Sequence, residues 1–283
     1  MAGFLHLINI LQVFLIFLGM AKINLDKYYT PADLAEYCVK KTKQIIGEEN
    51  ITEWLEPSAG AGVFLPYLDN NYLAFDIEPE AENIEQKNYL ELDLPYFKGR
   101  CVIGNPPFGT RNTLSVKFYK NSLKYGDYIA FILPASQYNN NQQMYEFDLV
   151  HSEMLPLQKF TDRDLLCSFN IYKRPTNGVN KKPIDYSLSD VDVLEWRRGG
   201  TYEVPVNYDI GICAWGSVGA EIKHQGQYAL ENYIIIKNEA YKEEIINVIR
   251  NAKWNELYPC IATPRLGQWK IYKYLREQIP QLV

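Results

Sequence analysis

The sequence predicts an α/β fold in which a mostly parallel sheet is followed by a smaller α+β domain. Short apolar runs rich in β-branched and aromatic residues alternate with helical patterns between residues 51 and 173, as in the βα units that build parallel sheets. After KRPTNG (173–178) the composition shifts to alternating stretches with several glycines, which indicates a second domain. We expect ligands at the carboxyl ends of the parallel strands.

The elements of both domains can be read in order. Thr30-Pro31 favours a helix start, with Thr30 as N-cap and Pro31 at the first helical position, and the helical pattern runs to Gly47. A second helix is expected over 239–252, and the spacing of 265–279 indicates a terminal helix that packs back on the first domain. The predicted strands are 51–57, 72–78, 101–107, 128–134 and 167–173.

Length and composition limit the functions that the chain can have. The chain has 283 residues, of which 47% are hydrophobic and 22% charged, so it can form two globular domains with proper cores. Its formal net charge of −5 gives no global signature of nucleic-acid binding. Such binding would depend on local basic clusters, and the candidates are Lys181-Lys182, Arg197-Arg198 and the series Lys270, Lys273 and Arg276.

The five cysteines are widely spaced, and most lie inside apolar runs. This pattern predicts free thiols in the reducing cytoplasm and disfavours a disulfide framework. None of the three histidines has the spacing of metal ligands. We therefore expect no metal site.

The first 19 residues form a hydrophobic extension of about the length that crosses a membrane. No basic residue precedes Leu5, as a secretory signal would require. Polar sequence begins after Met20, which favours a true start at Met20 over a membrane anchor. We divide the chain into the extension 1–19, a catalytic domain 20–178 and a second domain 179–283, and we expect no membrane association.

A glycine-rich loop is the first candidate binding element. Glu56-Pro57-Ser58-Ala59-Gly60-Ala61-Gly62 follows a strand and precedes a helix-like run, so its backbone can approach a ligand and the helix start would offer N–H groups. Asp76 ends the next strand and can accept hydrogen bonds from ribose hydroxyls. No third glycine follows to hold a pyrophosphate, so the pattern favours a nucleoside, with a plain structural turn as the alternative.

A stiff corner is the second candidate element. In CVIGNPPFG (101–109) an apolar strand breaks into Asn105-Pro106-Pro107. Proline fixes φ, lacks an N–H and favours extended geometry in the residue before it, so this stretch of backbone is rigid. A proline pair alone is typical of an ordinary strand exit, and only its surroundings can make it a site.

In combination the motifs resemble a known family. The order of KYYTP (27–31), EPSAGAG (56–62), AFDIEPE (74–80) and GNPPFG (104–109) is similar to that of the gamma class of S-adenosylmethionine-dependent DNA adenine-N6 methyltransferases. The resemblance covers residues 22–175. It implies the Rossmann-like class I methyltransferase fold, with a mixed, mostly parallel seven-stranded sheet, and a C-terminal target-recognition domain.

The resemblance implies S-adenosyl-L-methionine as the cofactor. The YYTP element would touch its methionine moiety, the glycine-rich loop would surround it, and Asp76 would bind the ribose. Related enzymes bind the amino group of the cofactor's adenine with an Asp. This chain has Asn88 at that position, and Asp93 is a less favoured substitute. The implied cofactor-binding residues are Tyr29, Thr30, Glu56, Pro57, Ser58, Ala59, Gly60, Gly62, Asp76 and Asn88.

The resemblance also implies that Asn105, Pro106, Pro107 and Phe108 are catalytic. The N6 amine of adenine is a poor nucleophile because it is conjugated with the ring. The Asn105 side-chain oxygen and the Pro106 carbonyl would hold both N6 hydrogens and aim the nitrogen at the methyl group, so catalysis would come from positioning and electrostatics. The adenine would be flipped out of the duplex and stacked on Phe108, with Phe160, or alternatively Phe169, on its other face.

Double-stranded DNA is the expected partner, together with a cognate restriction endonuclease. Asn, rather than Ser, at the first position of the corner favours adenine over the N4 amine of cytosine. The YYTP element and the C-terminal domain count against methylation of a protein glutamine or of RNA, and the complete corner counts against a binding module that has lost catalysis. These alternatives stay open on sequence alone.

Overall fold

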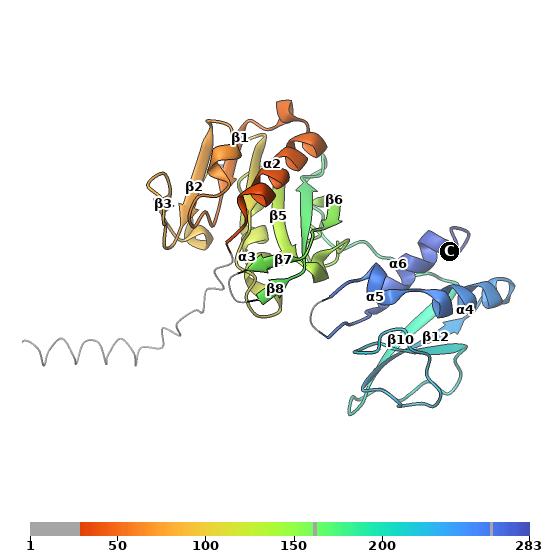
Figure 1. Ribbon diagram of the computed structural model, residues 1–283. Helices are drawn as coiled ribbons and strands as arrows, with labels where there is room; N and C mark the ends of the chain where they lie inside the picture. The colour runs from red at the N-terminus through yellow and green to blue at the C-terminus, as the bar shows by residue number, and fades with distance from the viewer. Residues whose placement is uncertain (1–28, 161–162, 261–262) are drawn as a thin grey trace, which may run out of the picture.

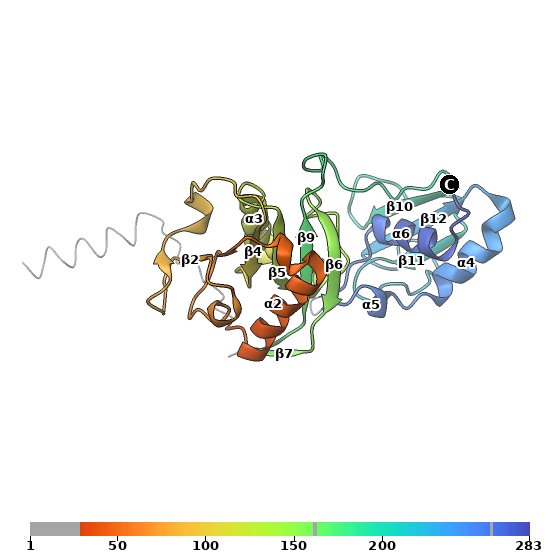
Figure 2. The same ribbon diagram turned by 90° about the horizontal axis from the view of Figure 1, so that it is seen from above.

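The computed structural model describes residues 29–160, 163–260 and 263–283, and the predicted extension 1–19 lies outside these ranges (Figure 1). The seven-stranded sheet and the three-stranded sheet form two domains that lie side by side (Figure 2). In the described ranges, no helix has both the length and the apolar character needed to cross a bilayer.

The first domain is built on a sheet with the strand order β3-β2-β1-β4-β5-β9-β6. The pairs β1–β2, β1–β4, β2–β3 and β4–β5 are parallel, and β9 runs antiparallel between β5 and β6. This arrangement confirms the predicted class I methyltransferase fold. The strands are β1 Glu53–Glu56, β2 Tyr72–Asp76, β3 Glu85–Gln86, β4 Arg100–Gly104, β5 Tyr128–Pro134, β6 Asp148–Met154 and β9 Cys167–Lys173; a hairpin joins β7 Gln158–Phe160 to β8 Arg163–Leu165.

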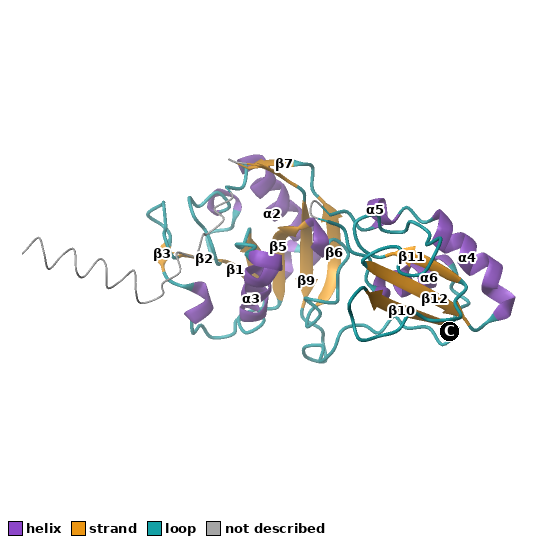
Figure 3. Cartoon of the chain, turned by 90° about the horizontal axis from the view of Figure 1, so that it is seen from below, coloured by secondary structure: helices purple, strands orange, loops and turns teal. Residues whose placement is uncertain are grey.

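Helices cover both faces of this sheet (Figures 2 and 3). Alternate residues of β1 point to opposite faces, so Trp54 belongs to the core cluster that contains Leu34 and Cys38 of α2 (Ala32–Ile46), while Leu55 belongs to the cluster that contains Phe118 of α3 (Thr113–Ser122). All strands that the sequence predicted are present. The short β3 and the edge strand β6 were missed because neither has an apolar run of its own.

The expected helix after the glycine-rich loop is absent. The connection from β1 to β2 spans only residues 57–71, and its regular part is the 3-10 turn Leu65–Tyr67, which contains Pro66. The left-handed backbone of Gly60 and Gly62 and the proline in the 3-10 turn break a continuous helix in this connection. The prediction was wrong at this point, and the loop backbone, rather than a helix end, faces the ligand edge.

The second domain packs helices against an antiparallel sheet of order β10-β12-β11. The apolar stripe of the terminal helix, Ile271 and Leu275, joins the core of this domain, so the prediction that it packs on the first domain was wrong. Without this helix, part of the apolar face of the three-stranded sheet would be left uncovered. The elements are β10 Val191–Arg197, β11 Ile210–Cys213, β12 Leu230–Ile236, α4 Lys242–Asn251, α5 Trp254–Leu257 and α6 Gln268–Gln278, and the remaining 3-10 turns are Glu48–Asn50, Tyr89–Glu91, Thr110–Asn112, Ala135–Gln137 and Glu239–Tyr241.

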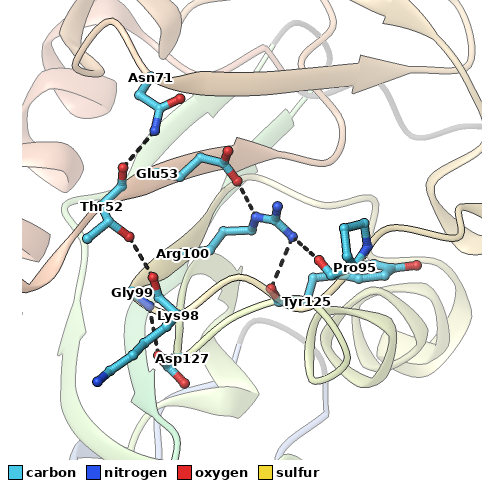
Figure 4. Close-up of polar contacts among 9 residues, drawn as sticks. All are labelled: Thr52, Glu53, Asn71, Pro95, Lys98, Gly99, Arg100, Tyr125 and Asp127. Carbon is cyan, nitrogen blue, oxygen red and sulfur yellow. Dashed lines mark hydrogen bonds and ion pairs between the residues drawn. The ribbon is translucent and has the colours of Figure 1, made fainter.

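A buried ion pair joins the amino ends of β1 and β4 (Figure 4). Arg100 is 3% exposed. Its Nε is hydrogen-bonded to Glu53, and its Nη1 donates to the carbonyl oxygens of Pro95 and Tyr125 over 2.7 and 3.1 Å. The network lies at the end of these strands opposite to the carboxyl end, so it stabilises the sheet from the side away from the expected ligand.

Candidate active site

The carboxyl ends of β1, β2 and β4 border a cavity of about 250 Å³. Open parallel sheets bind ligands at this edge, as the sequence predicted for this chain. The cavity wall brings together most of the predicted cofactor residues and part of the corner: Tyr29, Thr30, Glu56, Pro57, Ser58, Ala59, Gly60, Asp76, Asn88, Asn105 and Pro107.

The glycine-rich loop is held by Asp76. Gly60 donates its N–H to Asp76 Oδ2, and Glu78 donates its N–H to Asp76 Oδ1, each over 2.8 Å. Gly60 has a φ of +52°, and a β-carbon there would meet no atom within 4 Å, so its backbone is open on the cavity side. Each carboxylate oxygen has a further lone pair. Asp76 can therefore fix the loop and still accept hydrogen bonds from hydroxyl groups of a ligand.

Gly62 lies at the turn of the glycine-rich loop. It is not part of the cavity wall. Its φ of +75° is a backbone conformation that favours glycine, and a β-carbon would lie 3.1 Å from Leu65 Cδ1. The contact of Gly62 with the cofactor stays a prediction.

Glu56 places a buried carboxyl group at the cavity. The residue is 1% exposed, and its Oε2 has no hydrogen-bond partner among the described residues. Burial, with a smaller contribution from the negative charge of Asp76, raises the pKa of Glu56 well above its ordinary value. A buried polar atom without a partner is costly and rare, so Glu56 is suited to a ligand that brings a donor or a positive charge.

The charged side chains on the cavity wall are all acidic, namely Glu56, Asp76 and Glu80. No wall residue within the described part of the chain is Lys, Arg or His. A phosphate group would meet like charge here and would find no basic side chain. The cavity therefore favours a neutral or cationic ligand, in agreement with the predicted nucleoside without pyrophosphate.

The corner is tied to the N-terminal motif by a hydrogen bond. Asn105 Nδ2 donates to Thr30 Oγ1 over 3.2 Å, and Ser58 Oγ donates to the Asn105 carbonyl oxygen over 3.4 Å. The helix α2 begins at Ala32 with Pro31 as its N-cap, and no side chain caps it. The prediction that Thr30 is the N-cap was wrong because its hydroxyl is used to orient Asn105.

A second hydrogen bond links the N-terminal motif to the segment after β2. Tyr29 donates its hydroxyl to Glu80 Oε1 over 2.8 Å, and both residues contribute to the cavity wall. Glu80 is the last residue of the AFDIEPE motif, and the sequence predicts no role for it. The sequence signal was weak, because only the tertiary fold brings residues 29 and 80 together.

Asn88 also lies at the cavity, at the start of the 3-10 turn Tyr89–Glu91. Its Oδ1 accepts from the N–H of Leu90 over 3.1 Å, and its Nδ2 donates to Glu91 Oε1 over 2.6 Å. Its oxygen can accept another hydrogen bond. The less favoured alternative, Asp93, is not part of the cavity wall.

Phe108 lies at a different cavity from its neighbours. A cleft of about 900 Å³ separates the two domains, and its wall includes Phe108 and Asn112 from the first domain and Tyr258 and Lys270 from the second. Asn105 and Pro107 line the smaller cavity instead. The corner thus forms the boundary between the two cavities. Pro106 is buried at this boundary and lines neither.

The two other predicted stacking residues do not join this arrangement. Phe169 is fully buried in the sheet core and lines neither cavity, so we correct the alternative that placed it against a base. Its strand β9 is paired on both sides, and Phe169 belongs to the core cluster that contains Leu34 and Cys38 of α2. Phe160 ends β7, but its side chain is outside the described part of the structure.

Part of the predicted basic series borders the cleft. Burial lowers the pKa of Lys270 to about 8, and its Nζ lies 4.6 Å from the centroid of the Tyr258 ring. Arg265, also on the cleft wall, is paired with Glu195 over 2.9 Å. Lys273 donates to the carbonyl oxygen of Asn139 across the domain boundary over 3.3 Å. Lys270 is therefore the member of the series that faces the cleft.

Among the described residues, no group of three or more His, Cys, Asp or Glu side chains could hold a metal ion. The cysteines are free thiols, and four of them are buried.

Comparisons with known proteins returned similarities to solved structures. No family model matches the chain, and no curated protein matches it. A structure from Thermoplasma acidophilum has a TM-score of 0.41 and 16% identity, covering 54% of this chain and 93% of its own. The 23S rRNA methyltransferase ErmE has a TM-score of 0.39 and 11% identity, with coverages of 56% and 71%. TrmN from Thermus thermophilus has a TM-score of 0.38 and 13% identity, with coverages of 54% and 51%.

Proposed function

We propose that this protein transfers the methyl group of S-adenosyl-L-methionine to the N6 amine of adenine in double-stranded DNA. The observation that carries the proposal is the position of the corner between two cavities: Asn105 and Pro107 line the small acidic cavity, and Phe108 lines the large cleft. A group that joins a small-molecule donor to a polymer acceptor must face both of them. As part of the same proposal, the enzyme acts in the cytoplasm beside a cognate restriction endonuclease.

The small cavity fits the proposed cofactor. Asp76 would accept the ribose hydroxyls, Glu56 would face the ammonium group of the methionine moiety, and Asn88 would accept the adenine amine. S-adenosylmethionine carries a positive charge on sulfur and no phosphate, which suits a wall whose charged side chains are acidic. When bound, the cofactor supplies an electrophilic methyl group.

The corner would prepare the acceptor. Asn105 gives its amide nitrogen to Thr30, so its oxygen is directed away from Thr30 and can accept one N6 hydrogen of a flipped adenine. The Pro106 carbonyl would accept the other, and Phe108 would stack on the ring. Because the proline pair holds these oxygens rigidly, little reorganisation is needed when the nitrogen attacks. The residue set contains no base, and the N6 proton would leave to solvent.

The decisive test is the chemical identity of the product. Purified protein would be incubated with labelled S-adenosylmethionine and, separately, with mixed-sequence duplex DNA, structured RNA and a protein extract. Nucleoside mass spectrometry of the DNA should show N6-methyladenine. Label in N4-methylcytosine, in RNA or in protein glutamine, with adenine in DNA unmodified, would refute the proposal and identify which alternative holds.

Thr30→Val should lower kcat for methyl transfer about fivefold to tenfold, because Asn105 loses the hydrogen bond of roughly 1 kcal/mol that fixes its amide. Thr30→Ser keeps the hydroxyl and should retain most of the activity. Steady-state kinetics at saturating cofactor would check this pair. Equal activity of the two variants would show that the contact does not position Asn105.

Glu56→Gln should weaken cofactor binding about 10- to 100-fold, since a charge-assisted contact is worth roughly 1.5–3 kcal/mol. Its pKa is raised by burial, so in the wild type the ammonium group must draw a proton off Glu56. Affinity should therefore rise with pH until the pH passes the raised pKa, and the Gln variant should lose this dependence. Calorimetric titration with S-adenosylhomocysteine at several pH values would measure both effects.

The Glu56 carboxyl group should make the ligand-free protein less stable as the pH rises, whereas it should make cofactor affinity increase with pH. A group whose pKa is raised in the folded state contributes its full stabilisation at pH values below its unfolded-state pKa, near 4.5 for Glu. This contribution is lost as the pH rises through the folded-state pKa. Ligand-free Glu56→Gln should therefore be more stable than the wild type at alkaline pH. Glu80→Gln is the control, and a similar change in pH dependence in that variant would argue against a special role for Glu56.

A further inference from the structure

The segment that follows the corner has an unusual backbone. Gly109, Arg111 and Asn112 have φ values of +65°, +54° and +65°. Residues other than glycine rarely adopt this left-handed conformation, and when they do the site often has a function. The segment is bound to the corner because Leu114 donates its N–H to the Phe108 carbonyl over 3.1 Å, and Asn112 donates its own to Gly109 over 3.3 Å.

The Asn112 side chain is buried without a partner. It is 6% exposed, and neither its Nδ2 nor its Oδ1 has a hydrogen-bond partner in the described part of the chain. Asn112 is the N-cap residue of α3, a position where Asn normally accepts from a backbone N–H, yet it makes no capping hydrogen bond. Asn112 is part of the wall of the cleft between the domains, as is Phe108.

A second residue of the cleft wall, Gln137, also has a buried side-chain amide whose hydrogen bonds are not all made. Gln137 is 2% exposed, and its Nε2 donates to Gln143 Oε1 over 2.7 Å. Its Oε1 has no partner among the described residues. Both Gln137 and Gln143 are part of the cleft wall. Because Gln143 takes the nitrogen, the acceptor oxygen is the part of the Gln137 amide whose hydrogen bonding is unmet.

Two buried amides with unmet hydrogen bonds on one cleft point to a ligand that meets them. Buried polar groups in folded proteins are nearly always paired, and side-chain amides match the donors and acceptors on nucleobase edges. In the proposed function, Asn105 and Pro106 occupy both N6 hydrogens of the flipped adenine. The ring nitrogens that remain on its edges are acceptors, and only a donor such as Asn112 Nδ2 can bind them.

Resting on that proposed function, we infer that Asn112 and Gln137 are specificity-determining residues that bind base edges of the DNA. Asn112 Nδ2 donates to a ring nitrogen beside the target amine, N1 or N7. Gln137 Oε1 accepts an amino hydrogen from a base next to the target. These contacts favour a target base with a ring acceptor beside its amine over guanine and thymine. A contact at N7 also excludes cytosine, and the Gln137 contact favours an amino-bearing neighbour.

The variants Asn112→Gly and Gln137→Met test the inference, with Asn251→Ala on the exposed face of α4 as a control. The substrate is a duplex that carries the context methylated by the wild type. Each of the two variants should keep the wild-type cofactor affinity and lose kcat/KM roughly 10- to 100-fold, the cost of one good base contact. The thermal midpoint of Asn112→Gly should not fall, because glycine accepts the left-handed backbone and leaves no unpaired amide.

Duplexes with 1-deazaadenine or 7-deazaadenine at the target identify the atom that Asn112 contacts. One of them should slow the wild type by the same factor as Asn112→Gly and should not slow that variant further. Full activity of both variants on normal DNA, or a thermal midpoint of Asn112→Gly several degrees lower, would overturn the inference while leaving adenine methylation by the wild type intact. Wild-type protein that methylates no adenine would instead overturn the proposed function.

Discussion

Replacing Asn105 by alanine is expected to lower kcat for methyl transfer by at least about 100-fold, the usual loss when one preorganised polar group is removed from a reacting centre. The side-chain oxygen is proposed to hold one N6 hydrogen, and the alanine methyl group cannot replace it. The backbone of the corner would remain, since the two prolines fix it. The Kd for S-adenosylmethionine should change little, because the proposed polar contacts with the cofactor are made mainly by Asp76 and Glu56 on the cavity wall.

Asn88→Ala is the matched control for this experiment. Asn88 lies on the same cavity wall, but its proposed contact is with the cofactor adenine. Its loss should raise the KM for the cofactor and leave kcat nearly unchanged at saturation. Single-turnover rates and cofactor titrations on both variants separate the two roles. Near-normal single-turnover rates in Asn105→Ala would contradict the catalytic role of the corner.

Replacing Arg100 by methionine is expected to lower the free energy of unfolding by about 3–5 kcal/mol, because one partner of a buried ion pair is lost. Glu53 would keep its charge with only 13% of its side chain exposed. The carbonyl groups of Pro95 and Tyr125 would also lose their donor (Figure 4). Urea denaturation followed by circular dichroism would measure the change.

Lys40→Met provides the comparison. Lys40 pairs with Glu36 one helical turn away, and its side chain is 73% exposed. Exposed pairs of this kind contribute only about 0.3–0.5 kcal/mol. If the two variants lose similar stability, the buried network does not have the role assigned to it. Double replacement of Arg100 and Glu53 by apolar residues should recover much of the loss, because no unpaired charge then remains.

The sheet could be predicted from sequence because its strands are buried on both faces. Runs such as 101–104 and 128–134 contain no charged or amide side chain, and that pattern can be read without knowledge of the tertiary structure. The glycine-rich loop and the corner were predictable for a related reason: each follows such a run directly, so its place at the ligand edge was fixed by the strand. The edge strand Asp148–Met154 was missed since only one of its faces packs on the domain.

The missed features depend on contacts between distant segments. Thr30 has the sequence signature of a helix cap, and only the fold reveals that its hydroxyl meets Asn105, 75 positions away. Phe169 is predicted as an alternative stacking residue, yet its complete burial in the sheet core decides its role. The direction in which the terminal helix packs follows from an uncovered sheet in its own domain. No local pattern contains that information.

The position of the corner between two cavities has a thermodynamic consequence. One short, rigid backbone segment contributes to the walls of both chambers, so the occupants of the two chambers can meet at opposite sides of it. Linkage applies to the proposed pair of ligands: whatever factor bound cofactor contributes to the affinity for the proposed DNA substrate, bound DNA must contribute the same factor to the affinity for the cofactor. Measuring each Kd with and without the second ligand would give that shared factor twice, by independent routes.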